Sequence, residues 1–170
     1  AADFGATVDA GSVVATDLTT IVGQTSATID ATAATAITGT ASAVVAAINH
    51  GQVNHDSDFT VTLTADSTAA AADLKTINTA TSGIITATGV TAITGSASDV
   101  TDVLAVETNQ GNPGQQIDLD TDFTVTVSDT GNVSALTLTN IDDNTPGNVT
   151  VTNTVTLTGT ASDIATAASA

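Results

Sequence analysis

The sequence predicts a β-rich α/β repeat fold, a solenoid-like stack in which each coil contributes a strand and a short helix. Three observations support this: an internal repeat with a period of roughly 60 residues, Thr-rich segments that alternate with period two, and short capped helical patterns between them. Hydrophobic residues make up 41% of the 170, but Phe4, Phe59 and Phe123 are the only aromatic ones. Small and β-branched side chains suit a narrow stacked core better than a bulky globular core.

The repeat is centred on a glycine phrase that occurs as AITGTAS at 36–42, AITGSAS at 92–98 and TLTGTAS at 156–162. Its glycines, Gly39, Gly95 and Gly159, are 56 and 64 residues apart, and an Asp-Phe pair precedes each phrase at nearly constant spacing. Matched landmarks of this kind indicate a tandem array. We expect repeat unit 1 at 1–57, repeat unit 2 at 58–121 and a truncated unit 3 at 122–170, in one continuous array from a longer chain.

Strands are predicted where apolar residues and threonines alternate. DFTVTLT (58–64) and DFTVTVS (122–128) place Phe and Val on one face and Thr on the other, and NVTVTNTVTLTG (148–159) extends the same pattern. A period of two is typical of a half-buried strand, and the branched Cβ of threonine fits an exposed pleat. We therefore expect Val, Ile and Leu to face inward and threonines to line up outside.

Short helices are predicted over 69–77, 96–105 and 160–168. The last two open with Ser or Thr and an Asp that cap the first turn, and their apolar residues recur every three or four positions. Each full unit therefore reads as strand, helix, strand, helix, in two coils of about 28 to 32 residues that become stable by stacking. The alternative fold is a string of tandem small β-sandwich domains, which usually need about seven strands in 100 residues.

The charge of the chain restricts its partners. It carries 18 acidic residues against a single base, Lys75, for a net charge of −17. Nucleic acids and anionic membranes bind clustered Lys or Arg, so we expect neither as a partner. We also expect no membrane insertion, because no apolar run approaches the roughly 20 residues that span a bilayer. Cations are the more natural partners.

Aspartates precede two of the predicted strands, in HDSDF (55–59) and LDTDF (119–123). The candidate metal ligands are Asp56, Asp58, Asp118, Asp120 and Asp122. Alternate Asp residues in a loop can converge oxygens on Ca²⁺, which makes calcium the one candidate cofactor. The alternative is that these turns are solubilising edges that discourage sideways pairing of strands. A second set, Asp9, Asp66 and Asp129, is expected to form turns at the strand ends.

Other candidate sites have simpler interpretations. The glycine phrase could hold a phosphate at the start of the following helix, but no base lies near it in the sequence, which favours a tight strand-to-helix turn. His50 and His55 could bind zinc or act as a base, but zinc needs a third ligand and a base needs a nucleophile. We therefore expect no enzymatic activity and name no catalytic residue.

The phrases TAITGTAS, ITGSASDV and LTGTASDI, with strands such as DFTVTVSD, resemble the repeat regions of giant secreted bacterial cell-surface proteins. This group includes type I secreted adhesins, S-layer-like proteins and cyanobacterial surface proteins. The resemblance implies an extracellular, non-enzymatic and often calcium-dependent scaffold. We expect a filament, S-layer or adhesin stalk, and because the uncapped ends of a solenoid expose strand ladders, we expect its repeats or copies to associate head to tail. The Gly-Gly-x-Gly-x-Asp calcium nonapeptide of many members is absent. The alternative is a calcium-dependent adhesin module that binds a surface or carbohydrate.

Overall fold

A computed structural model describes residues 3–64, 67–107 and 116–169. The strands are β1 (Ala6–Thr7), β2 (Gly11–Val14), β3 (Ile29–Asp30), β4 (Ala34–Gly39), β5 (Val53–Asn54), β6 (Thr60–Leu63), β7 (Thr68–Ala70), β8 (Ile85–Ala87), β9 (Ala92–Gly95), β10 (Ile117–Leu119), β11 (Thr124–Val127), β12 (Gly131–Ser134), β13 (Val149–Val151) and β14 (Val155–Thr158). The helices are α1 (Ala15–Val22), α2 (Ala41–Ile48), α3 (Ala71–Ala80), α4 (Ala97–Leu104), α5 (Ala135–Asp143) and α6 (Ala161–Ala167).

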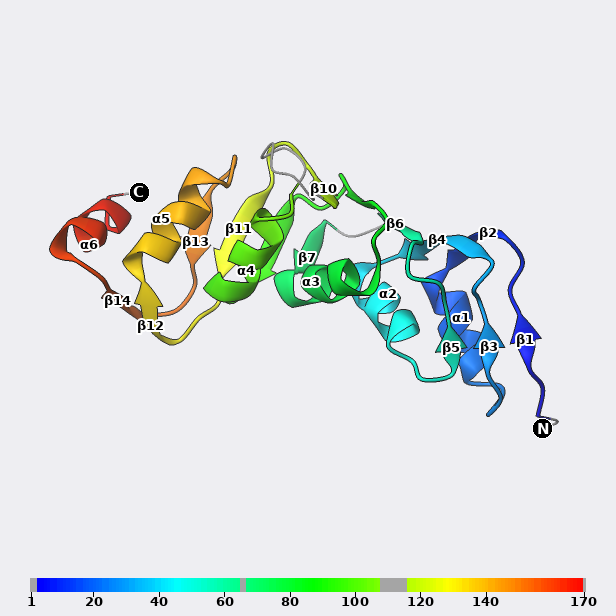
Figure 1. Ribbon diagram of the computed structural model, residues 1–170. Helices are drawn as coiled ribbons and strands as arrows, with labels where there is room; N and C mark the ends of the chain where they lie inside the picture. Colours follow the sequence, from blue (N-terminus) through cyan, green and yellow to red (C-terminus); the bar gives the residue numbers. More distant parts are fainter. Residues whose placement is uncertain (1–2, 65–66, 108–115, 170) are drawn as a thin grey trace.

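The fold is of the α/β type, with strands and helices alternating along the chain (Figure 1). Every pairing between described strands is parallel, in sheets ordered β1-β3-β5, β10-β8-β6-β4-β2, β13-β11-β9-β7 and β12-β14. The alternative of tandem β-sandwiches is therefore wrong, because the sheets of such sandwiches are antiparallel.

The helices predicted at 69–77, 96–105 and 160–168 are α3, α4 and α6. Helices α2, α4 and α6 begin directly after β4, β9 and β14, so the glycine phrase is a strand-to-helix corner, as its sequence predicts. The hydroxyls of Thr40, Ser96 and Thr160 accept the N–H of the third helical residue at 3.1–3.2 Å. Each hydroxyl satisfies a backbone donor that would otherwise have no partner at the helix start.

The strand register differs from the predicted coil length. Most paired strands are offset by 24 residues, as in Ile37↔Val61 and Val125↔Val149, and the offset rises to 32 between Ile85 and Ile117. Strands β7 and β12, which precede α3 and α5, each lie at the edge of a new sheet and pair with β9 and β14 at the same offset of 24 residues. Strands of three or four residues are too short for a period of two to reveal them in the sequence.

The longest predicted strand, over 148–159, is wrong as a single element. It divides into β13 and β14, which belong to different sheets. Asn153 occupies the break, and its side-chain amide donates to the carbonyl oxygens of Ser128 at 3.0 Å and Asp129 at 3.2 Å. These hydrogen bonds hold the turn against the preceding β11–β12 segment, a contact that alternation of apolar and polar residues does not encode.

The faces of the strands follow the predicted pattern. In β6, Val61 and Leu63 are buried while Thr60 is exposed, and in β11 Val125 and Val127 are buried. Threonines of neighbouring strands occur at the same register position and form two rows. These rows are Thr38–Thr62–Thr86 and Thr94–Thr126–Thr150.

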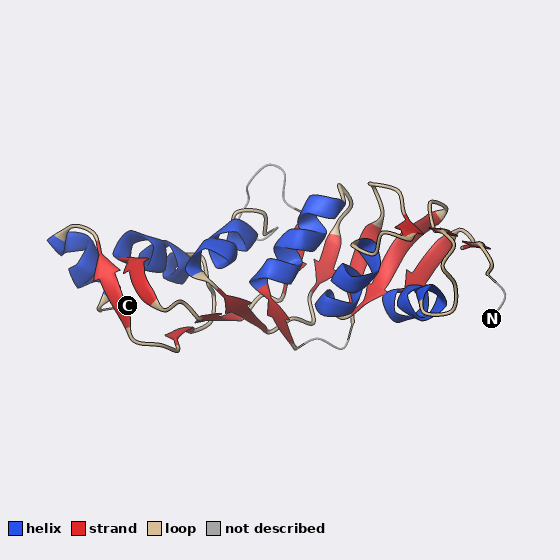
Figure 2. Cartoon of the chain, turned by 90° about the horizontal axis from the view of Figure 1, so that it is seen from below, coloured by secondary structure: helices blue, strands red, loops and turns tan. Residues whose placement is uncertain are grey.

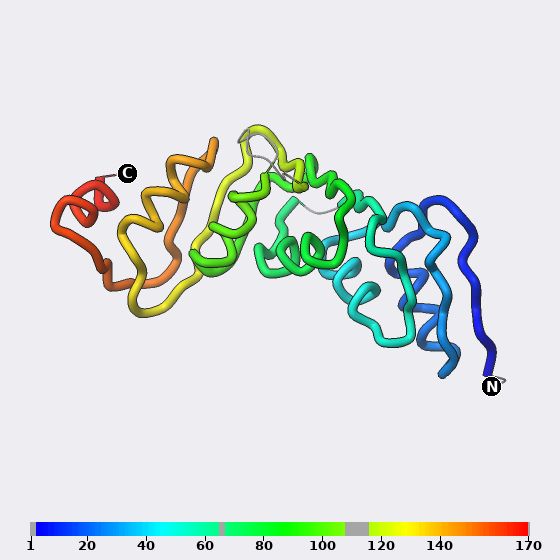
Figure 3. The backbone as a smooth tube through the Cα atoms, viewed as in Figure 1, coloured from blue at the N-terminus to red at the C-terminus, as the bar shows by residue number. Residues whose placement is uncertain are grey.

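The molecule is elongated, with its two ends far apart, as Figures 1 and 3 show. Each helix contacts the next one along the chain, from α1 to α6, and Figure 2 shows the helices as one row with the strands beside them. One continuous cluster of buried apolar residues joins the helices to the sheets, with Phe59 and Phe123 as its largest side chains. In the described part of the chain, no helix has the length and apolar character needed to cross a membrane.

Candidate functional site

The glycine of the repeated phrase permits a close contact between neighbouring helices and corners. A Cβ atom added at Gly39 would lie 3.3 Å from the Cβ of Ala15, and one added at Gly95 would lie 3.0 Å from the Cβ of Ala71. Gly39 and Gly159 also have φ angles of 153° and 148°, which L side chains rarely adopt. The residue is therefore required by backbone geometry and packing.

A phosphate site at this corner is not supported by its surroundings. The sequence places no base near the glycine phrase, but the fold brings Lys75 of α3 to the start of α4. There its ammonium group lies 3.0 Å from Asp99 and 2.7 Å from Asp102. These partners raise the pKa of Lys75, and the Lys75 ammonium and the Ser96 hydroxyl lower the pKa of Asp99. The only cationic side chain of the chain is thus already engaged by two carboxylates.

A second repeated contact was not predicted. Thr25 and Thr81 occupy equivalent positions after α1 and α3, and each hydroxyl donates to the carbonyl oxygen of an Asp-Phe pair, at Phe4 and Phe59 respectively. After α5, the N–H of Gly147 donates to Phe123 O at 3.0 Å. The signal was present in the sequence, because TSA at 25–27, TSG at 81–83 and TPG at 145–147 keep the spacing of the glycine phrase.

The candidate calcium ligands do not converge. Asp56 and Asp58 are exposed, and the Asp56 carboxylate accepts the N–H of Ser57 at 3.1 Å. Asp118 lies in β10, at the edge of its sheet. Within the described ranges, no group of three or more His, Asp or Glu side chains is arranged to hold a metal ion.

Asp120 and Asp122 do come together. The carboxylate of Asp120 accepts the backbone N–H of Asp122 at 3.3 Å, and its proximity raises the pKa of the Asp122 carboxyl through hydrogen bonding and charge repulsion. Two carboxylates in an exposed turn provide fewer oxygens than the six to eight that Ca²⁺ takes, unless water or backbone supplies the others.

The second acidic set has mixed roles. Asp66 lies outside the described residues, and Asp9 is exposed near β1. Asp129 has a defined role, because its carboxylate accepts the N–H of Ala97 at 2.6 Å and so caps the first turn of α4 from a different segment. A negative charge at a helix start is favourable.

Both histidines make contacts within the protein. The ring of His55 lies between the carbonyl oxygens of Ile48 and Asp56, at 3.2 and 2.7 Å from its two nitrogens, and packs edge-on against Phe59. His50 accepts the N–H of Gln52. Both rings therefore have structural contacts in the connection around β5.

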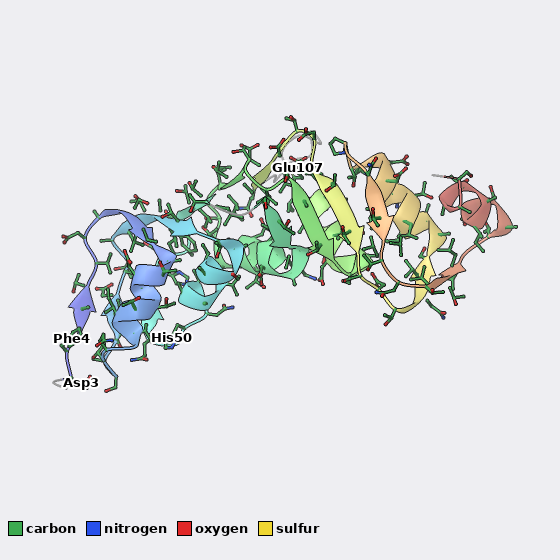
Figure 4. All side chains as sticks on the ribbon, turned by 180° about the vertical axis from the view of Figure 1, so that it is seen from behind. Asp3, Phe4, His50 and Glu107 are labelled. Atoms are coloured by element: carbon green, nitrogen blue, oxygen red, sulfur yellow. The ribbon has the colours of Figure 1, made fainter. Side chains whose placement is uncertain are left out.

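The two ends of the molecule expose apolar surface. Phe4 is 45% exposed, whereas Phe59 and Phe123, at the same position of units 2 and 3, are 1% and 0% exposed. Phe4 lies beside Asp3 at the N-terminal end (Figure 4). At the other end Leu157 is only half-buried, although its equivalents Ile37 and Ile93 are buried.

Each of these ends also has an open sheet edge. Among the described strands, β1 pairs only with β3 and β14 pairs only with β12. Open strands present backbone N–H and C=O groups that can pair with another chain. Strands β2, β5, β7, β10, β12 and β13 also lie at sheet edges, so open edges occur along the molecule as well as at its two ends.

Comparisons with protein-family models, with curated proteins and with solved structures found no match for this chain.

Proposed function

We propose that this chain is part of a non-enzymatic, extracellular structural protein that forms a filament, an S-layer or an adhesin stalk by stacking of repeats. The observation that carries the proposal is the parallel pairing of every second strand along the chain, which extends the molecule along one axis and leaves β1 and β14 with an open edge at its two ends. A protein built in this way holds its two ends far apart, and this structural role requires no catalytic site.

The finer fold within this proposal is a solenoid-like stack. Each strand-strand-helix segment buries its apolar face mainly against the segments before and after it, as the contacts between successive helices and strands indicate. The free energy of unfolding of such a stack is approximately the sum of the stabilities of the single repeats and of the interfaces between neighbouring repeats. Repeats can therefore be added without changing the core. This property suits a spacer or a coat.

The surface chemistry supports a structural role. The outward threonines use their hydroxyls within the protein. Thr60 and Thr158 each donate to a backbone carbonyl of the neighbouring paired strand, and Thr124 donates to the carbonyl of Thr91, directly before β9. The donors that a carbohydrate or surface ligand would engage are thus partly occupied. A net charge of −17 keeps the sides of neighbouring molecules apart and leaves the uncapped ends as the favoured contacts.

Electron microscopy and light scattering of the purified chain over a concentration series test this proposal. We expect linear particles that lengthen with concentration, because end-to-end contacts of unlike surfaces give fibres when the rotation does not close. A monodisperse monomer at every concentration and salt level would contradict it. Small-angle scattering supplies the control, since an elongated monomer profile separates failure of assembly from failure of the fold.

A calcium-dependent binding module remains the alternative proposal, and calcium itself separates the two. A stalk without metal should melt at the same temperature in excess EDTA and in millimolar CaCl₂. If calcium binds at Asp120 and Asp122, it should raise the melting temperature, and Asp120→Asn should abolish the increase. Magnesium at the same ionic strength is the control for simple screening of the negative charge.

A further inference from the structure

The central sheet provides a complete example of how strands from successive units combine. It contains five strands in the order β2-β4-β6-β8-β10. The sheets at the two ends contain fewer strands, with β1-β3-β5 at the N-terminal end and β12-β14 at the C-terminal end. Together the two end sheets hold the same number of strands as the central one.

The internal repeat shows which strands of the central sheet correspond to the three strands of the N-terminal sheet. Ala6↔Ile29 corresponds to Val61↔Ile85, and Ile29↔Val53 corresponds to Ile85↔Ile117. Strands β1, β3 and β5 are thus the counterparts of β6, β8 and β10, the last three strands of the central sheet. The N-terminal sheet lacks the first two.

The C-terminal sheet contains the two kinds of strand that the N-terminal sheet lacks. Val133↔Leu157 corresponds to Val13↔Ile37, so β12 and β14 are the counterparts of β2 and β4. In the central sheet the far edge of β4 is paired with β6. The open edge of β14 is therefore the kind of edge to which a strand such as β1 binds.

We propose that β14 of one copy pairs in parallel with β1 of a second copy, completing a five-stranded sheet β12-β14-β1-β3-β5 across the junction. The register follows from two internal examples. Ile37↔Val61 and Ile93↔Val125 place Leu157 opposite Ala6, and Thr38↔Thr62 and Thr94↔Thr126 place Thr158 opposite Thr7. The inference rests on the proposed stacking function and specifies its contact.

Burial supports the same junction. Ala161 is exposed and Ile164 half-buried on α6, whereas their counterparts Ala41 and Val44 are buried on α2, a helix that packs against both α1 and α3. Phe4 is exposed on the opposing end. The proposed contact continues the α2–α3 and α4–α5 interfaces by placing α6 against α1 of the next copy, and it brings Phe4 next to the C-terminal end of that neighbour.

Cysteine cross-linking tests the register, because the natural chain has no cysteine. Parallel strands lie about 4.8 Å apart, within the Cα separation of roughly 4.4–6.8 Å that a disulfide spans. Thr7 and Thr158 are both exposed at the open ends. We expect a mixture of Thr7→Cys and Thr158→Cys chains to give a disulfide-linked dimer of the two variants, and the double variant to give a ladder of oligomers.

Two control pairs show how much cross-linking to expect from cysteines in register and out of register. Thr38→Cys with Thr62→Cys in one chain tests the same geometry inside the molecule and should give an intramolecular disulfide. Thr7→Cys mixed with Thr156→Cys places the second thiol two residues out of register on the same face, and should cross-link several-fold more slowly. Equal cross-linking of the two mixtures, or none in either, would overturn the proposed pairing.

The apolar part of the contact is tested by Phe4→Asp. Because Phe4 is exposed in the single chain, the variant should keep the melting temperature of the dilute monomer while association weakens at least about tenfold. Ile84→Asp, at an exposed apolar position directly before β8 of the central sheet, is the matched control and should associate normally. An equal effect of the two variants would contradict the assignment of the Phe4 surface.

The cross-linking and association results separate this interface from the proposed function. Fibres that form without the Thr7–Thr158 cross-link and tolerate Phe4→Asp would keep the structural function but refute this interface. A chain that remains monomeric would refute both, and would indicate that a different partner covers the two edges.

Discussion

At the scale of single residues, Gly83 and Gly147 lie where the backbone of an Asp-Phe pair passes closest. A Cβ atom at Gly147 would come within 2.6 Å of Phe123 O, and one at Gly83 would clash with the carbonyl group of Phe59. These are backbone atoms that cannot move aside as a side chain can. The requirement for glycine is therefore one of space, and neither residue has an unusual positive φ.

We predict that Gly83→Ala destabilises the protein by about 1–3 kcal/mol, because the added methyl group forces apart two packed backbone segments. Urea unfolding followed by circular dichroism measures the change. Gly51→Ala is the control, because a Cβ atom added at Gly51 would have no neighbouring atom within 4 Å, and it should change the midpoint little. Equal midpoints for the two variants would show that the segments can separate at little cost.

The three phenylalanines give a second residue-scale prediction. Phe59→Ala removes a fully buried ring and should cost about 3–5 kcal/mol in unfolding free energy. Phe4→Ala at the equivalent but exposed position should cost far less in dilute solution. Chemical denaturation of both variants at low protein concentration measures the difference, and similar losses would mean that the N-terminal segment is covered in solution.

At the scale of elements, Lys75 joins α3 to α4 through Asp99 and Asp102. Both helices face solvent on this side, so the ion pairs are screened and add modestly to stability. Their pH dependence has a definite sign. Lys75 has a raised pKa, so its contribution is lost as pH rises above its ordinary 10.5, and Asp99 has a lowered pKa, so its contribution is lost as pH falls below 3.8.

We predict that Lys75→Gln lowers the melting temperature slightly at neutral pH and low salt, and that the difference disappears in about 1 M NaCl, where the Debye length is near 3 Å. The difference should also vanish well below pH 3.8. A double-mutant cycle with Asp102→Asn isolates the pair. Additive effects of the two substitutions would mean that the ammonium and carboxylate do not interact in solution.

Sequence patterns predict helices more completely than strands in this protein. The corners at Thr40, Ser96 and Thr160 are visible because a capping residue, a glycine and an apolar spacing occur together. Strands of two or three residues, such as β3 and β7, carry no such signal. Their existence depends on the partner strand, because a segment this short is stabilised by the backbone hydrogen bonds of its neighbours.

At the scale of the whole molecule, the proposed end-to-end association would bring strongly negative rods together against the repulsion of their charges. Both ends carry acids, with Asp17 on α1 and Asp163 on α6, and each copy has a net charge of −17. End-to-end contact buries apolar surface at a cost in repulsion that salt reduces. The balance between these two terms sets the conditions for assembly.

We predict that raising NaCl from about 10 mM to 150 mM promotes association, because the Debye length falls from roughly 30 Å to 8 Å. Static light scattering at fixed protein concentration measures the change in mean mass. Asp17→Asn with Asp163→Asn should reduce the salt dependence, and Asp58→Asn with Asp73→Asn, which removes the same charge before β6 and on α3, is the control. Association that weakens steadily with salt would indicate an electrostatic contact of a different kind.

Local chemistry in the sequence determined the glycine corners, the helix caps, the inward Val and Ile and the outward threonines, because periodicity and capping involve residues close in the chain. Only the tertiary structure decided the 24-residue register, the division of 148–159 into β13 and β14, the carbonyl contacts of Thr25 and Thr81, and the pairing of Lys75 with α4. These features depend on which distant segments meet. That choice follows from burying the apolar faces of strands and helices from distant parts of the chain in one core, which no single segment can do alone.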